Sequence, residues 1–301
     1  MTTPSASRAR APGDPAAALL AIRDPAARPH AGADWRARLD LLRHELARHE
    51  RVVVAYSGGV DSSVLLAVAH EQLGRNALGV IGVSDSYASR ELELALAQAA
   101  RLGARVETVT TGELADPAFA GNSEDRCYHC KRELFSKLAL VAARERCDFV
   151  IDGTIADDLA DWRPGRRAAA EGNVRSPLAE LGFQKSDVRA AAEALGLTSA
   201  GKPASPCLAS RIPYGTAITR ENLSQVERGE ALLRELGFAE LRLRHHGDIA
   251  RIEVPLAELA RLTEPAVRAR VVAGLKGLGF RWVALDLEGF RSGGLNPPAL
   301  P

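Results

Sequence analysis

The stretch VVVAYSGGVDSS, residues 52–63, joins a run of apolar residues to a glycine turn and the start of a helix. A continuous apolar run is typical of a central parallel strand that is buried on both faces. Gly58 and Gly59 let backbone N–H groups approach a phosphate closely, and the N-terminus of the following helix adds a partial positive charge. Ser57 and Ser62 carry hydroxyls that can donate further hydrogen bonds. Because no lysine stands in the loop, the stretch predicts a phosphate-binding loop that is not a Walker A motif.

Strands and helices alternate along the chain as far as residue 200. Helices are predicted at 35–50, 62–74 (with Asp61 or Ser62 as N-cap), 89–103 and 131–145, and strands at 51–57, 78–83, 104–110 and 147–152. This alternation predicts right-handed βαβ units and an α/β fold with a doubly wound parallel sheet. Ligands of such sheets bind beyond the carboxyl ends of the strands. The turns SGGVDS and DGTIADD (152–158), which follow the first and last of these strands, are therefore expected on one rim.

The pattern changes after residue 200, where Gly201, Pro203 and Pro206 interrupt the chain. Helices are then predicted at 221–236 and 264–277, and strands at 239–246, 249–254 and 280–287. This mixture indicates a smaller C-terminal α+β domain. The predicted division is a disordered extension at 1–34, an α/β domain at 35–205, an α+β domain at 206–290 and a flexible tail at 291–301.

The composition has no excess of either charge. Of the 301 residues, 39 are Lys or Arg and 38 are Asp or Glu, which gives a net charge of +1. Nucleic-acid partners usually require a basic stripe, and the sequence has no basic run apart from RPGRR at 163–167, so a tRNA or DNA partner is not expected. No apolar run approaches the ~18 residues of a membrane span, and the N-terminus lacks a secretory signal. We therefore expect a cytoplasmic protein.

Four cysteines stand in three different contexts. Cys127 and Cys130 form a CxxC, which suits half of a zinc site, part of an iron–sulfur site or a redox pair. Because a second CxxC is missing, a four-cysteine zinc ribbon is excluded. Cys147 opens an apolar strand and is expected to be a small buried residue. Cys207 lies close to Arg211, which either lowers the pKa of the thiol or pins the turn.

Two arginines in the C-terminal region form a second candidate binding feature. Arg242 and Arg244 are two residues apart on a predicted strand, so they share one face. Paired guanidinium groups suit a nucleotide phosphate, and together with Glu230 they are candidates for a phosphate or metal contact. The alternative is a solvated face of an edge strand.

Several of these pieces stand in one order along the chain: YSGGVDSS (56–63), RCYHCKRELF (126–135), DGTIADDLADWRPGRRA (152–168), VRSPLAELGF (174–183) and PCLASRIPYGTAIT (206–219). In this order the sequence resembles the LarE family of ATP-dependent sulfur transferases, within the PP-loop superfamily of ATP pyrophosphatases. Two places depart from the family pattern. Ala156 stands where an Asn is commoner, which weakens the case for adenosine contacts there, and TSAG (198–201) replaces a stretch that usually carries a Trp and an Asp.

The resemblance implies a reaction in which ATP, with Mg²⁺, adenylates a carboxylate of pyridinium-3,5-biscarboxylic acid mononucleotide, and sulfur then replaces AMP to leave a thiocarboxylate. In one branch of the family a cysteine gives up its own sulfur and becomes dehydroalanine. In another branch three cysteines hold a [4Fe-4S] cluster, whose unique iron can carry the extra sulfide. Cys127, Cys130 and Cys207 suit the second branch, and Cys207 is needed in both.

The same resemblance implies roles for individual residues. Asp61 is expected to hold Mg²⁺ or orient the pyrophosphate, and Asp61, Cys207 and Arg211 are expected to take part in catalysis. Contacts with ATP are expected from eight residues of the two glycine turns: Ser57, Gly58, Gly59, Asp61, Ser62, Thr154, Asp157 and Asp158. The family also implies a homo-oligomer that works with other proteins of nickel-pincer nucleotide biosynthesis.

Two other hypotheses stay open. The chain could be a different PP-loop enzyme, such as a tRNA thiolase or an ammonia-using synthetase, although its near-neutral charge counts against tRNA. It could also be a non-enzymatic, nucleotide-binding iron–sulfur sensor, which would bind ATP without releasing pyrophosphate. The sequence leaves undecided the source of the sulfur, the choice between a sacrificial cysteine and a cluster, the oligomeric state and the nickel enzyme that is served.

Overall fold

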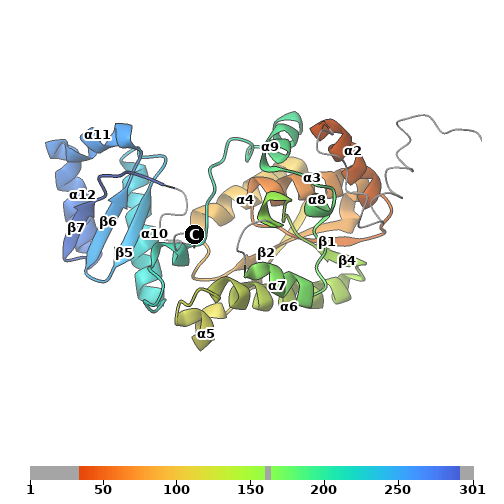
Figure 1. Cartoon of the computed structure of the whole chain (residues 1–301), viewed down its shortest axis with the longest axis horizontal. Coiled ribbons are helices and arrows are strands. Elements are labelled where there is room, and N and C mark those ends of the chain that lie inside the picture. The colour runs from red at the N-terminus through yellow and green to blue at the C-terminus, as the bar shows by residue number, and fades with distance from the viewer. Residues whose placement is uncertain (1–33, 160–163, 292–301) are drawn as a thin grey trace, which may run out of the picture.

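The computed structural model describes residues 34–159 and 164–291, which fold around two separate β-sheets. The two sheets lie toward opposite ends of the longest axis in Figure 1. The predicted extension at 1–34 (except Asp34) and the predicted tail at 291–301 (except Arg291) lie outside the described residues. Within the described ranges, no helix is both long enough and apolar enough to cross a membrane.

The N-terminal part alternates strands and helices, as predicted. Its strands are β1 (Val52–Ala55), β2 (Ala77–Val83), β3 (Arg105–Thr110) and β4 (Phe149–Ile151). Its helices are α2 (Trp35–Leu46), α3 (Val60–Leu73), α4 (Ser89–Leu102), α5 (Pro117–Ala120), α6 (Arg126–Glu145), α7 (Gly165–Glu171), α8 (Pro177–Glu180) and α9 (Lys185–Ala194). Helices α5, α7, α8 and α9 were not predicted. The first three are too short to show a periodic pattern.

The four strands are parallel and are ordered β3-β2-β1-β4. Val54 of β1 lies opposite Gly79 of β2 on one side and Ile151 of β4 on the other. The chain proceeds outward from β1 through β2 to β3 and then returns to the far side of β1, so the strand order reverses between β1 and β4. Ligands of parallel sheets bind at such a switch point. The two glycine turns follow the two strands that flank it.

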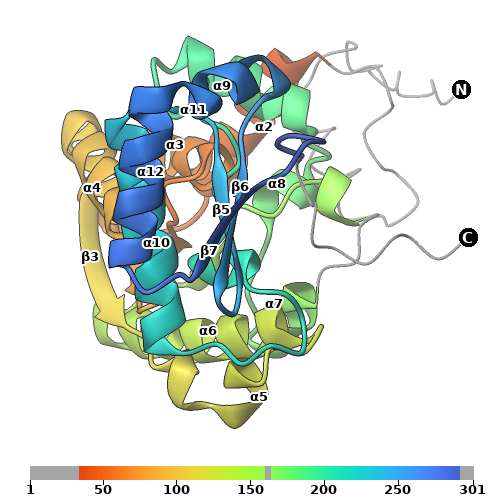
Figure 2. The same ribbon diagram turned by 90° about the vertical axis from the view of Figure 1, so that its left-hand side faces the viewer.

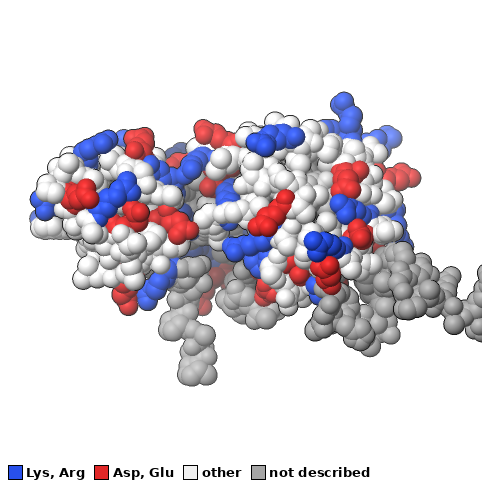
Figure 3. All heavy atoms as spheres, turned by 90° about the horizontal axis from the view of Figure 1, so that it is seen from above, with Lys and Arg blue, Asp and Glu red and all other residues white. Residues whose placement is uncertain are grey.

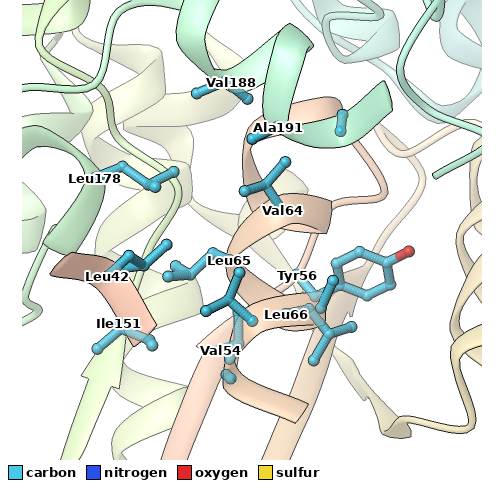
Figure 4. Packing of buried hydrophobic residues seen from close by; sticks show 14 of the residues in the cluster. Leu42, Val54, Tyr56, Val64, Leu65, Leu66, Ile151, Leu178, Val188 and Ala191 are labelled. Carbon is cyan, nitrogen blue, oxygen red and sulfur yellow. The ribbon is translucent and has the colours of Figure 1, made fainter. Parts of the chain in front are cut away.

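Helices cover both faces of this sheet, as expected for a doubly wound α/β fold. In Figure 1, α2, α3, α4 and α9 lie over one face, and α6 and α7 lie under the other. Alternate residues of β1 enter two different cores: Val52 and Val54 join the core beneath α2 and α3, while Val53 and Ala55 join the core against α6. Figure 4 shows the first core, with Val54 among residues of α2, α3, α8 and α9. Because both faces are covered, every residue of β1 is buried, which explains its unbroken apolar run.

The C-terminal part is a small mixed α+β unit, also as predicted. It contains α10 (Arg220–Glu235), β5 (Arg242–His246), β6 (Ile249–Glu253), α11 (Leu259–Thr263), α12 (Pro265–Gly277) and β7 (Trp282–Leu285). The strand order is β5-β6-β7, with β5 antiparallel and β7 parallel to β6. Figure 2 shows α10 and α12 side by side against this sheet, and residues such as Leu233, Leu243 and Leu275 form their shared core.

Helix α6 begins earlier than the sequence pattern indicated. It starts at Arg126 rather than at residue 131, because its first turn carries polar and cysteine residues that do not show the apolar spacing. Cys127 and Cys130 therefore stand on a helix, three residues apart and on neighbouring positions of one face.

Candidate active site

The phosphate loop connects β1 to α3 and is closed by its own side chains. Gly58 has a φ of +66°, and a Cβ at this position would come 2.6 Å from the Cβ of Ala95, so only glycine fits. The hydroxyl of Ser62 donates to the carbonyl of Gly59 (3.1 Å) and accepts from the backbone N–H of Ser57 (3.2 Å). The first N–H groups of α3 have no partners within the helix, so they are available to an anion.

The prediction that Asp61 or Ser62 is the N-cap of this helix is wrong. Helix α3 begins at Val60 with Gly59 as its N-cap, so both residues lie in its first turn. The hydroxyl of Ser62 is occupied with the loop itself, and the carboxylate of Asp61 is bound by a lysine from another helix. Neither side chain is therefore in a position to cap.

The second glycine turn, DGTIADD, lies directly against the phosphate loop. A Cβ on Gly153 would come 2.8 Å from the backbone nitrogen of Ser62. The buried carboxylate of Asp152 accepts from the N–H of Thr154 (3.1 Å), from its hydroxyl (2.8 Å) and from the hydroxyl of Ser176 (2.7 Å). Asp158 accepts from the N–H of Ile155 within the same turn (3.1 Å). The two turns thus form one continuous rim, and residues 160–163 of the second motif lie outside the described residues.

Lys185 joins the two turns and was missed by the sequence analysis. Its ammonium lies 2.8 Å from each carboxylate oxygen of Asp61, and its backbone N–H donates to Asp157 (2.9 Å). It is the first residue of α9, where the helix dipole disfavours a positive charge. No helix was predicted at 185–194, so the sequence analysis had no signal that marked this lysine.

A second lysine contacts the other side of the phosphate loop. The ammonium of Lys202 donates to the carbonyl of Gly58 (3.2 Å) and lies 2.6 Å from the carboxylate of Glu91. A few residues further on, the N–H of Leu208 donates to the carbonyl of Ser86 (2.8 Å). The segment from 202 to 208 therefore runs from the phosphate loop to the position of Cys207.

The structure brings Cys127, Cys130 and Cys207 into one neighbourhood. Cys127 and Cys207 are exposed, whereas Cys130 is partly buried and packs against a core that includes Leu208. The three thiols are close enough for their charges to affect one another's pKa. Cys147 lies elsewhere, half-buried against the core beside α6, in keeping with a small packing residue.

Two of these thiols, Cys130 and Cys207, are harder to ionise than free cysteine, because their pKa is raised. Burial is the main cause that raises the pKa of Cys130, and the charge of Glu113 adds to it. Cys207 remains accessible to solvent, yet the protein around it excludes enough water to raise the pKa of its thiol, and Cys127 adds to this effect. The charges of Arg126 and Arg211 act in the opposite direction without outweighing it. The expected lowering by Arg211 is thus present but does not decide the pKa of Cys207.

Arg211 holds the turn at Cys207 through hydrogen bonds. It is 2% exposed, and it forms a two-point pair with Glu230 at 2.8 and 3.1 Å. Its remaining nitrogen donates to the carbonyls of Pro206 and Cys207 (2.5 and 3.1 Å) and to the hydroxyl of Ser210 (3.0 Å). These contacts correspond to the pinning alternative of the sequence analysis.

Arg242 and Arg244 differ in their pairing. Arg244 is buried in a two-point pair with Glu253 at 2.8 and 2.7 Å and donates to the carbonyl of Ser210 (3.0 Å). Arg242 donates to backbone carbonyls, including that of Ala204 (2.8 Å), and no carboxylate within the described ranges pairs with it. Burial, together with the charges of Arg211 and Arg244, lowers the pKa of Arg242 to about 10. Arg242 is therefore the member of the pair that an anion would stabilise.

The metals that the resemblance implies differ in the donor sets they need. Within residues 34–159 and 164–291, no three His, Cys, Asp or Glu side chains converge as a single ion would require. Mg²⁺ fits nevertheless, because it is usually bound by one or two carboxylates together with substrate phosphates, and Asp61 and Asp157 both meet Lys185 at the phosphate loop. The three neighbouring thiols are soft donors that suit an iron–sulfur cluster, which spans more space than a single ion.

The reversed strand order, with a lysine-free SGGVDS loop at its switch point, defines an ATP-using α/β protein of the PP-loop class. Comparison with known proteins agrees, since residues 35–152 match the NAD synthase family. The chain is also 30% identical over 201 residues to the glutamine-hydrolyzing GMP synthase of Aeropyrum pernix, a match that covers 61% of this chain and 39% of that protein.

Two relatives match over most of their length. An uncharacterized protein of Synechocystis is 44% identical over 259 residues, which is 86% of this chain and 97% of that protein. Pyridinium-3,5-bisthiocarboxylic acid mononucleotide synthase of Lactiplantibacillus plantarum is 44% identical over 248 residues, which is 82% of this chain and 89% of that protein. The chain therefore belongs to the LarE family, which includes this synthase.

Proposed function

We propose that this chain is an ATP-dependent sulfur transferase that adenylates a carboxylate of pyridinium-3,5-biscarboxylic acid mononucleotide and replaces the AMP with sulfur. The observation that carries the proposal is the segment from Lys202 to Leu208, which runs from the ATP phosphate loop to the thiol of Cys207. Support comes from the Lactiplantibacillus plantarum relative, which is named as a synthase of pyridinium-3,5-bisthiocarboxylic acid mononucleotide. That compound is the proposed substrate with sulfur in its carboxylate groups.

The first step forms the acyl adenylate. A carboxylate oxygen of the substrate attacks the α-phosphorus of ATP, and the bond between the α-phosphorus and the bridging oxygen breaks, so that pyrophosphate leaves. The first N–H groups of α3, that of Ser62 among them, and the hydroxyl of Ser57 would bind the leaving pyrophosphate, while the hydroxyl of Ser62 keeps the loop closed. Gly58 and Gly59 let the backbone approach it. Asp61 and Asp157 would hold the Mg²⁺, which neutralises the phosphate charge when bound.

The second turn has a supporting role in this step. The hydroxyl of Thr154 donates to the buried Asp152, and Asp158 accepts from the backbone of its own turn, so both keep the DGTIADD turn in shape. Their contacts with ATP follow from the position of this turn against Ser62, and they stay predictions.

The second step transfers sulfur. A sulfur nucleophile attacks the carbonyl carbon of the adenylate, the bond to the AMP oxygen breaks, and a thiocarboxylate remains. If Cys207 gives its own sulfur, its Cβ–S bond then breaks with loss of the Cα proton, which leaves dehydroalanine. Alternatively, Cys127, Cys130 and Cys207 would hold a [4Fe-4S] cluster, which supplies a site for the extra sulfide when bound. Arg211 positions Cys207 in either case, because it holds the backbone carbonyl of that residue.

The C-terminal sheet provides a candidate site for the substrate phosphate. Of Arg242 and Arg244, Arg242 is the one without a carboxylate partner in the described residues, and it donates to the carbonyl of Ala204, near Cys207 in the chain. Glu230 and Arg244 are paired with other buried charges, so they support the site rather than contact the phosphate.

The cellular setting is part of the same proposal. We place the protein in the cytoplasm, as a homo-oligomer that works with other proteins of nickel-pincer nucleotide biosynthesis. Nucleic acid is not expected as a partner, because Lys and Arg are interspersed with Asp and Glu over the face shown in Figure 3.

The test measures pyrophosphate release from the full chain, purified without oxygen, with ATP and three acceptors. The dicarboxylate mononucleotide should support release, whereas tRNA and ammonia should not. Asp61→Ala should reduce release by about a hundredfold or more, because the metal and its charge are lost. Release with tRNA would establish a thiolase instead, and ATP binding without release would establish a sensor. Loss of one H₂S from Cys207 in the intact mass would identify a sacrificial donor, and iron with sulfide in the active protein would identify the cluster.

A further inference from the structure

Lys185 occupies the place beside Asp61 where a metal ion is expected. Its ammonium lies at 2.8 Å from both carboxylate oxygens, so it takes up the two atoms with which Asp61 would bind Mg²⁺. Its backbone N–H meanwhile donates to Asp157, the second carboxylate of the rim. The positive charge opposite Asp61 is therefore that of a lysine.

The surroundings of Lys185 allow this ammonium to leave. Its side chain is 39% exposed and that of Asp61 is 26% exposed, so water can replace either partner. An ammonium on a flexible four-carbon stem can change partners without moving the backbone. The start of α9 also repels a positive charge weakly, which disfavours the resting position.

A second lysine nearby provides a contrast. Lys202 is paired with Glu91 at 2.6 Å and with a backbone carbonyl of the loop, and its side chain is only 16% exposed. Its carboxylate partner, Glu91, lies on α4, which follows β2. Glu91 is therefore not on a turn that follows β1 or β4, the two strands at the switch point. Metal binding at Asp61 would therefore displace Lys185 and leave Lys202 in place.

We propose that Lys185 holds the cation position at Asp61 in the free enzyme, and that Mg²⁺–ATP displaces its ammonium onto the pyrophosphate part of the nucleotide. Lys185 would then be the phosphate-binding lysine that the SGGVDS loop itself lacks. The exchange keeps the charge of the rim compensated in both states. This inference rests on the proposed function only in that ATP must bind at this loop together with Mg²⁺.

The first experiment measures metal binding without nucleotide, with Mn²⁺ as the probe and electron paramagnetic resonance as the readout. Lys185→Gln should bind Mn²⁺ about tenfold more tightly than wild type, because the variant has no ion pair to break and no ammonium to repel the metal. Adding Asp61→Asn to this variant should abolish the gain. Lys276→Gln, which removes an exposed lysine of α12, is the matched control and should bind Mn²⁺ as wild type does.

The second experiment measures the affinity for ATP at a saturating concentration of Mg²⁺, where the metal position is filled in wild type and variant alike. Lys185→Gln should bind ATP about tenfold more weakly than wild type, and Lys185→Arg should restore most of the affinity, because a guanidinium also binds phosphate. Tighter metal binding with weaker ATP binding is a pair of opposite changes that a merely structural ion pair would not produce. Unchanged Mn²⁺ affinity in Lys185→Gln would overturn the inference, even if the enzyme releases pyrophosphate as proposed. If the wild type releases no pyrophosphate, the proposed function is overturned. The Mn²⁺ comparison would then still decide whether Lys185 holds the cation position.

Discussion

Replacing Arg211 with alanine removes the central ion of a buried network. Arg211 and Glu230 each have a side-chain exposure of 2%, and they are joined by two hydrogen bonds. The third nitrogen of Arg211 donates hydrogen bonds to the carbonyls of Pro206 and Cys207 and to the hydroxyl of Ser210. After the substitution, Glu230 keeps the guanidinium of Arg234 at 2.8 Å, and the turn at Cys207 loses its donors.

The expected loss follows from these contacts. Removing one partner of a buried ion pair destabilises a protein by about 3–5 kcal/mol, because the other charge stays buried without compensation. Arg234 still contacts Glu230, so the lower end, about 3 kcal/mol in the free energy of unfolding, is expected at neutral pH. For a chain of this size, that corresponds to a fall in Tm of about 6–12 °C.

The loss should depend on pH in a defined direction. Burial alone would raise the pKa of Glu230, but the charges and hydrogen bonds of Arg211 and Arg234 outweigh it, and the pKa lies below its ordinary value. A lowered pKa stabilises the fold above the unfolded value of about 4.3, and this contribution disappears as the pH falls through the folded pKa. The difference between wild type and Arg211→Ala should therefore be largest near pH 7 and shrink below about pH 4.

The assay is urea unfolding followed by circular dichroism at pH 7 and at about pH 3, below the ordinary pKa of a glutamate. Arg220→Ala is the control, because Arg220 is 79% exposed and pairs with Asp85 only at the surface, and it should cost less than about 1 kcal/mol. A loss below about 1 kcal/mol in Arg211→Ala would refute the reasoning, and so would a loss that grows at low pH.

Two further predictions concern the thiol and the glycine turns. The raised pKa of Cys207 means that its alkylation by iodoacetamide should be slow at pH 7 and rise about tenfold per pH unit through pH 8, and a plateau below pH 8 would contradict this. Gly153→Ala should destabilise the protein by about 1–3 kcal/mol and weaken ATP binding, because its Cβ would lie 2.8 Å from the backbone nitrogen of Ser62. Gly201→Ala, with nothing within 4 Å of its Cβ, should change neither quantity in the same thermal-shift and binding assays.

Much of the fold could be predicted because its signals are local. The apolar run before Ser57 reports burial on both faces, and the alternation of strands and helices restricts the topology to right-handed crossovers. The start of α6 could not be predicted, because Cys127 and Cys130 interrupt the apolar spacing of its first turn. The candidate site was located through its glycine turns, whereas Lys185 was missed because its partner Asp61 is 124 residues away.

By itself, the sequence determined which candidate groups are available: a lysine-free phosphate loop at 57–62, a second acidic turn at 152–158, and the cysteines Cys127, Cys130 and Cys207. These are properties of residue type and short spacing, which local backbone geometry converts directly into structure. Only the tertiary structure decided which charges are free. Arg211 and Arg244 are held by buried carboxylates, while Arg242 has none within the described residues. The reason is that pairing and desolvation depend on distances between segments far apart in the chain, and neither leaves a trace in local sequence.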